Sequence, residues 1–137
     1  MVNIMNVLQI TFVSSFVVIL SACFGQTPTP HPSIIDLSTF EFVEMIKNDG
    51  ILIDVQTLEE FDEAHLEKAI QMDYYSDAFE KVAMELPKEK VIYVYCRSGS
   101  RSASASKIFL EQGHPKVYNL IGGITEWQNA GLPVFSE

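Results

Sequence analysis

Short apolar runs alternate with amphipathic segments along most of the chain, and this alternation predicts strands that are each followed by a helix. Residues 51–55 (ILIDV) form a nearly continuous apolar run, which is typical of a strand covered on both faces. Residues 90–96 (KVIYVYC) form the clearest strand signal. Shorter strands are predicted at residues 68–72 (KAIQM) and 116–120 (KVYNL).

Helix signals lie between these strands. Two capping boxes, in which Ser or Thr precedes Glu by three positions, are Ser38 with Glu41 and Thr57 with Glu60. In the first of these helices Phe40, Val43 and Ile46 fall at helical spacing, so we expect them in the core. Further helices are predicted at residues 76–86, 101–113 and 124–130.

This order of elements indicates the α/β class, with a central, mostly parallel sheet of about five strands and helices on both faces. The chain has 137 residues, of which 47 % are hydrophobic, and this is enough apolar mass for one domain. Its net charge of -9 argues against non-specific binding of nucleic acid, because a phosphate backbone would be repelled.

The N-terminal segment has a different composition. No acidic residue occurs before Asp36 and no Lys or Arg before Lys47. Residues 20–23 (LSAC) end an apolar run and resemble the lipobox of bacterial lipoproteins, and Pro- and Thr-rich residues follow. The resemblance implies a signal peptide at residues 1–22, a lipid on Cys23, a tether at 23–33 and a folded domain at 34–137. The protein would then face the periplasm of the cell envelope, held at a membrane.

An uncleaved N-terminal anchor is the alternative to lipidation. The first residues, MVNIMN, carry no Lys or Arg, although signal peptides usually do. Residues 4–24 are uncharged and approach the length of a membrane span. Both alternatives place the domain outside the cytoplasm.

Cys96 is the only cysteine besides Cys23, so a lipidated protein would hold it without an internal disulfide partner. It follows a predicted strand and precedes a helix, at the end of the sheet where ligands bind in α/β folds. Two arginines, the backbone amides of a small turn and the positive end of the helix would favour its thiolate, the reactive form. A buried structural cysteine is the alternative. The expected substrate-binding loop is Arg97, Ser98, Gly99, Ser100, Arg101 and Ser102.

Three segments, around LIDVQTLEEFDEAHLEKAI, VIYVYCRSGSRS and GGITEWQNAGLPV, resemble the signature regions of single-domain rhodaneses, in their usual order. The resemblance implies a three-layer rhodanese-like fold and a sulfurtransferase. Cys96 would take sulfur from a donor such as thiosulfate, hold it as a persulfide, and pass it to cyanide in vitro or to a thiol in the cell. A protein is one class of such acceptor. The resemblance implies no metal and no organic cofactor.

Two further functions compete with this one. Related cysteine phosphatases carry C-x5-R, whereas Arg101 here completes only C-x4-R, so phosphatase activity is not expected. A membrane-anchored binding or persulfide-relay module, without turnover of thiosulfate, stays open as an alternative. A thiol redox protein would need a resolving cysteine, and none follows Cys96.

Supporting residues follow from the same resemblance. Asp54 could orient the site or stabilise a turn, His65 is expected to make a structural hydrogen bond, and Trp127 packs in the core or lines the pocket. Gln56 replaces the arginine usual in the family, and AHLEKA replaces a turn of small residues. The three histidines are scattered and suggest no metal site. The acidic cluster is expected to be a solvated helix face: Glu59, Glu60, Asp62 and Glu63.

Overall fold

The computed structural model describes residues 31–137. The predicted signal peptide at 1–22, the lipidation at Cys23 and most of the predicted tether lie outside the described residues. Within residues 31–137, no helix has both the length and the apolar character that a membrane span requires.

A five-stranded sheet forms the centre of the domain, and each of its paired strands runs parallel to its neighbour. The strands lie in the order β1-β5-β4-β2-β3, which confirms the α/β class and the parallel sheet. Their bounds are β1 Ser33–Leu37, β2 Ile51–Asp54, β3 Ile70–Gln71, β4 Ile92–Tyr95 and β5 Lys116–Leu120. The sequence did not predict β1.

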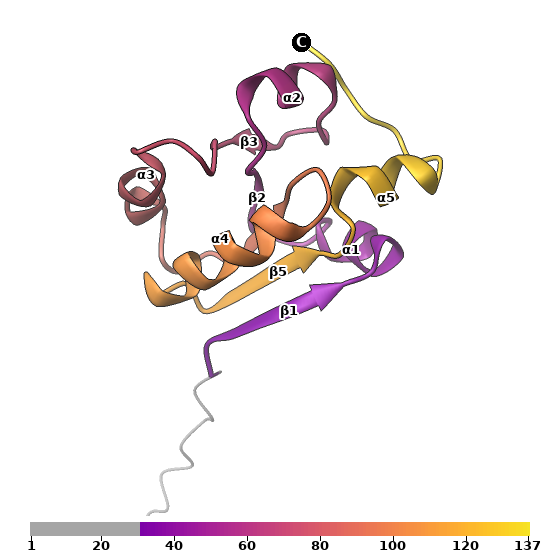
Figure 1. The fold of residues 1–137 in the computed structure, drawn as a ribbon. Coiled ribbons are helices and arrows are strands. Elements are labelled where there is room, and N and C mark those ends of the chain that lie inside the picture. The colour runs from indigo at the N-terminus through magenta and orange to yellow at the C-terminus, as the bar shows by residue number, and fades with distance from the viewer. Residues whose placement is uncertain (1–30) are drawn as a thin grey trace, which may run out of the picture.

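Helices cover both faces of the sheet, and one helix lies beyond its end (Figure 1). α1 (Thr39–Met45) and α5 (Gly123–Asn129) pack on one face, while α3 (Phe79–Glu85) and α4 (Ser100–Glu111) pack on the other. α2 (Leu58–Glu63) follows β2 and lies past the carboxyl ends of the strands. This arrangement confirms the predicted parallel sheet with helices on both faces and is the three-layer fold that the family resemblance implied.

Strand β4 is buried on both faces, and its side chains alternate between two cores. Ile92, Val94 and the following Cys96 contact the core under α3 and α4. Tyr93 and Tyr95 contact the core under α1 and α5. All five side chains are at most 2 % exposed, so the strand that leads into the predicted site has little freedom to move.

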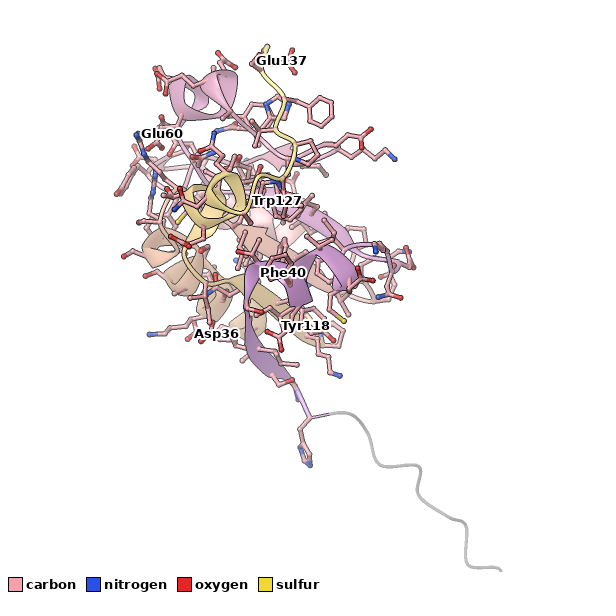
Figure 2. All side chains as sticks on the ribbon, turned by 90° about the vertical axis from the view of Figure 1, so that its right-hand side faces the viewer. Asp36, Phe40, Glu60, Tyr118, Trp127 and Glu137 are labelled. Carbon is pink, nitrogen blue, oxygen red and sulfur yellow. The ribbon has the colours of Figure 1, made fainter. Side chains whose placement is uncertain are left out.

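Both capping boxes form, but the core face of α1 differs from the prediction. The Glu41 carboxylate accepts hydrogen bonds from the backbone amide and hydroxyl of Ser38. The Glu60 carboxylate accepts from the Thr57 amide at 3.0 Å, and the Thr57 hydroxyl accepts from the Glu60 amide at 3.3 Å. Phe40 is 71 % exposed and points away from the sheet (Figure 2), so the prediction that it is a core residue was wrong. Phe42 is fully buried instead, with its ring edge-on to Tyr93. Aromatic residues two positions apart cannot share one face of a helix.

The turn at residues 66–69 contains the departure from the family pattern. The Ala69 amide donates to the Leu66 carbonyl at 3.1 Å, which closes a four-residue turn. Lys68 occupies its third position with φ of 64°, and it is the only residue other than glycine with positive φ among residues 31–137. A side chain in this left-handed region is strained, so the turn forms at an energetic cost.

We predict that Lys68→Gly raises the free energy of unfolding by about 0.5–1 kcal/mol, because glycine adopts this φ without strain. Glu67→Gly in the same turn is the matched control. Glu67 has ordinary φ, so glycine there should only increase the entropy of the unfolded chain and lower stability. Urea unfolding of the three proteins measures both effects, and a loss of stability in Lys68→Gly would contradict the prediction.

Candidate active site

Cys96 directly follows β4, and the loop after it turns back toward the sulfur. The Gly99 amide donates a hydrogen bond to Cys96 Sγ at 3.1 Å, and Gly99 has φ of 95°, a conformation that favours glycine. Cys96 is fully buried, whereas Arg97 and Ser98 beside it are exposed. Burial alone would suit a structural cysteine. A backbone amide that donates to the sulfur, between two arginines, stabilises a negative charge on it.

Residues at the start of α5 fix the backbone of this loop through hydrogen bonds. The Ile124 amide donates to the Cys96 carbonyl at 2.9 Å, and the Thr125 amide and hydroxyl both donate to the Arg97 carbonyl, at 3.1 and 2.8 Å. Gly123 has φ of 59°, and a Cβ on it would overlap the Cys96 carbonyl oxygen. The close approach of the two backbones therefore requires glycine at this position.

The loop residues divide between the surface and the interior. Arg97, Ser98 and Ser100 are exposed at the surface of the loop. Ser102 is fully buried, and its hydroxyl donates to the Gly99 carbonyl at 3.1 Å. Ser102 thus fixes the loop conformation from inside, and the exposed positions are the ones available to a substrate.

Glu60 joins both arginines of the loop. Its carboxylate accepts two hydrogen bonds from Arg101, at 2.6 and 2.9 Å, and lies 3.7 Å from Arg97. The Arg101 guanidinium also lies over the Tyr75 ring, 5.4 Å from its centre. The hydrogen bond from Arg101 is the main reason that the pKa of Glu60 is lowered, and Glu60 in turn raises the pKa of Arg101.

The expectation of a solvated acidic face was therefore wrong for Glu60, whose side chain is only 21 % exposed. Its neighbours Glu59, Asp62 and Glu63 are exposed as expected. The sequence also predicts Glu60 as the partner of Thr57 in a capping box. The capping box is confirmed. A glutamate in a capping box is held near the start of its helix, and its carboxylate can still accept hydrogen bonds from a second partner.

A cavity of about 350 Å³ opens beside the loop, between α2 and α5. Its lining is mostly polar and includes Gln56, Glu60, Glu63, Arg97, Thr125 and Gln128. Arg97 is the only cation in this lining, against two carboxylates. The cavity lining therefore carries no net positive charge.

Asp54 lies behind this cavity as part of a buried hydrogen-bond network. Its carboxylate accepts from the Gln56 backbone and side-chain amides at 2.8 and 2.9 Å, and the neighbouring Tyr95 hydroxyl lowers its pKa. Tyr95 in turn accepts from the Leu66 amide at 2.9 Å. Burial raises the pKa of Asp54 more than these hydrogen bonds lower it, and no cation stands where Gln56 replaces the usual arginine. Asp54 thus supports the ends of β2 and β4.

His65 and Trp127 have structural positions away from the loop. His65 stacks on Phe61, hydrogen-bonds the Phe61 carbonyl through Nδ1 at 2.9 Å, and pairs through its backbone with Phe135. Trp127 is buried in the core under α5 and donates Nε1–H to the Pro133 carbonyl at 2.9 Å (Figure 2). Within residues 31–137, no group of three or more His, Cys, Asp or Glu side chains is placed to hold a metal ion.

Comparisons with known proteins agree with this geometry. The family model described as a rhodanese-like domain matches residues 38–130. A sulfurtransferase of Allochromatium vinosum is 35 % identical over 86 residues, which are 63 % of this chain and 78 % of that protein. The thiosulfate sulfurtransferase GlpE of Coxiella burnetii is 31 % identical over 98 residues, 72 % of this chain and 88 % of its own length.

Two other similar proteins extend the comparison. The putative sulfur carrier protein YrkF of Bacillus subtilis is 33 % identical over 97 residues, and the match spans 69 % of this chain but only 51 % of that protein. The crystal structure of a rhodanese-related protein from Thermoplasma volcanium superposes with a TM-score of 0.66 at 28 % identity, and covers 75 % of this chain and 99 % of that one.

We predict that Gly123→Ala lowers the free energy of unfolding by more than about 2 kcal/mol, because a methyl group would displace the Cys96 carbonyl and would also be strained at positive φ. Gly131→Ala separates these two effects. Gly131 also has positive φ, 72°, but no atom lies within 4 Å of a Cβ there, so only the strain should remain. Chemical denaturation measures both variants, and equal losses would contradict the argument from close approach.

We also predict that Asp54→Asn changes how stability depends on pH. Because burial raises the pKa of Asp54, the folded protein binds this proton more tightly than the unfolded chain does. The contribution of this carboxyl to stability is then present at low pH and is lost as the pH rises through its raised pKa. Denaturant unfolding from about pH 3 to about pH 7 should show the Asn variant gaining stability relative to wild type. A difference that is independent of pH would refute this assignment.

Proposed function

The chain belongs to the rhodanese-like domain family, and from this premise we propose that it is a sulfurtransferase that carries sulfane sulfur as a persulfide on Cys96. The observation that supports this role most directly is the hydrogen bond from the Gly99 amide to Cys96 Sγ. A thiolate and a persulfide anion carry their charge at or next to this sulfur. The same amide therefore stabilises both forms.

The proposed reaction has two halves. The Cys96 thiolate attacks the outer sulfur of thiosulfate, the S–S bond of thiosulfate breaks, and sulfite leaves with the bonding electron pair. A thiolate or cyanide acceptor then attacks the outer sulfur of the persulfide, and Cys96 leaves as a thiolate. No net oxidant or reductant is needed, since each step exchanges one bond to sulfur for another.

The surroundings of Cys96 support both halves. The N-terminus of the 12-residue helix α4 directs its positive end toward the loop, which favours negative charge on the sulfur. The contacts from α5 hold the loop backbone before any substrate arrives, so little reorganisation is required during the reaction.

A persulfide relay without turnover of thiosulfate is the second candidate. The similarity to a putative sulfur carrier protein favours it, and so does the nearly balanced charge around the loop. In this case Cys96 would receive sulfur from another persulfide, small or protein-bound, and would deliver it to a protein thiol by the same exchange of bonds.

The proposed location rests on the sequence alone. The lipobox-like residues 20–23 and the Pro-rich residues that follow support a lipid anchor on Cys23, with the domain on the periplasmic side of a membrane. Tethering would restrict donors and acceptors to those that reach the membrane surface.

We expect intact-protein mass spectrometry to show a gain of one sulfur atom after thiosulfate is added, and its loss after cyanide. Cys96→Ser is the control and should gain none, because the nucleophile is absent. If Cys96 stays unmodified by thiosulfate yet reacts with an alkylating reagent, the thiosulfate reaction is refuted and the relay is favoured. Persulfide donors would then replace thiosulfate in the same measurement.

A further inference from the structure

The Glu60 carboxylate is hydrogen-bonded to both terminal nitrogens of Arg101, the groups with which a guanidinium binds a planar anion. It is held by two hydrogen bonds to the guanidinium, and the side chains of Glu60 and Arg101 are only 21 % and 13 % exposed. A paired, partly desolvated ion pair of this kind is harder to displace than an exposed one. Arg101 is therefore already neutralised before a substrate binds.

Arg97 does not restore a positive site. Its side chain is 62 % exposed, and its guanidinium lies 3.7 Å from the same carboxylate. Glu63 adds a second carboxylate to the cavity lining and forms no ion pair within residues 31–137. The cavity next to the loop thus holds one cation and two carboxylates, and the second cation, Arg101, is paired with one of these carboxylates, so a small dianion gains little attraction there.

We propose that Glu60 is a specificity-determining residue that disfavours small anionic sulfur substrates, thiosulfate included, and favours thiols and persulfides that are neutral or carry an ammonium group. This inference rests on the proposed function and defines its substrate class. An ammonium group in the cavity would meet the carboxylates of Glu60 and Glu63. A carboxylate or sulfonate group would have to displace Glu60 from Arg101 or approach it against charge repulsion.

The test compares two acceptor thiols of similar size and opposite charge, cysteamine and thioglycolate. Protein persulfidated on Cys96 is mixed with each thiol, and the rate of sulfur removal is followed by mass spectrometry. In Glu60→Gln the ratio of the cysteamine rate to the thioglycolate rate should fall about fivefold relative to wild type, because one carboxylate is removed and Arg101 is released. The KM for thiosulfate should fall by a similar factor with little change in kcat.

Glutamine suits this test because its side-chain oxygen still accepts from the Thr57 amide, so the start of α2 is preserved. Glu59→Gln is the matched control. It removes the same charge from an exposed position on the same helix, and the ratio of rates should not change. Glu60→Asp keeps the charge but shortens the reach to Arg101, so its ratio should lie between those of wild type and Glu60→Gln.

Salt provides a readout that a purely structural role would not affect. The difference between wild type and Glu60→Gln should shrink as salt rises from about 0.05 M to about 0.5 M, because added ions screen the charge of the substrate. If persulfidated wild type and Glu60→Gln show equal ratios of the cysteamine rate to the thioglycolate rate, the role of Glu60 is overturned, while the proposed sulfurtransferase function stands. A wild-type protein that takes up sulfur from neither thiosulfate nor a persulfide would overturn the proposed function, and the inference with it.

Discussion

The position of the sulfur depends on hydrogen bonds from the start of α5 to the carbonyls of Cys96 and Arg97. These groups lie more than twenty residues apart in the sequence but meet in space because β4 and β5 are neighbouring parallel strands. Parallel strands end at the same edge of a sheet, so the loop after one strand meets the turn after the next. The site is a product of strand order, and it would be lost in any arrangement that separated β4 from β5.

Charge at the site is balanced locally, although the chain as a whole is strongly acidic. The net charge is -9, yet around Cys96 the two arginines face an equal number of carboxylates. Neither the whole chain nor the surroundings of Cys96 therefore attract anions strongly over long distances. What remains to stabilise charge at the sulfur is short-range, namely a backbone amide and the end of α4. Such groups act on an anion formed within the loop more than on one arriving from solution.

The sequence predicted well those features that depend on local patterns. β2, β4 and β5 are apolar runs, both helices with capping boxes begin where those residues indicate, and the loop of Cys96 follows its strand. β1 escaped prediction because it is an edge strand next to a Pro-rich stretch, and its pairing with β5 is non-local. Phe40 was misassigned because apolar residues at 40, 42, 43 and 46 fit two helical faces.

The contact between Glu60 and Arg101 could not be predicted from spacing. The two residues are 41 positions apart, and the cap explained Glu60 without any distant partner. The substrate-binding loop stays a prediction in its residues, and the structure adds the Glu60 carboxylate to the charges around it. A motif gives the charges of one segment of the chain, whereas the electrostatic potential at a site also depends on charged side chains from other elements, here Glu60 on α2.

The pairing of His65 with Phe135 connects residues 135–137 to α2. Both backbone hydrogen bonds between these residues measure 2.9 Å, the Glu137 amide donates to the Asp62 carbonyl at 3.2 Å, and Figure 1 shows this segment beside α2. Because α2 carries Glu60, these backbone hydrogen bonds help to fix the helix whose carboxylate pairs with Arg101. Residues 135–137 therefore influence the charge around the loop indirectly, through the position of α2.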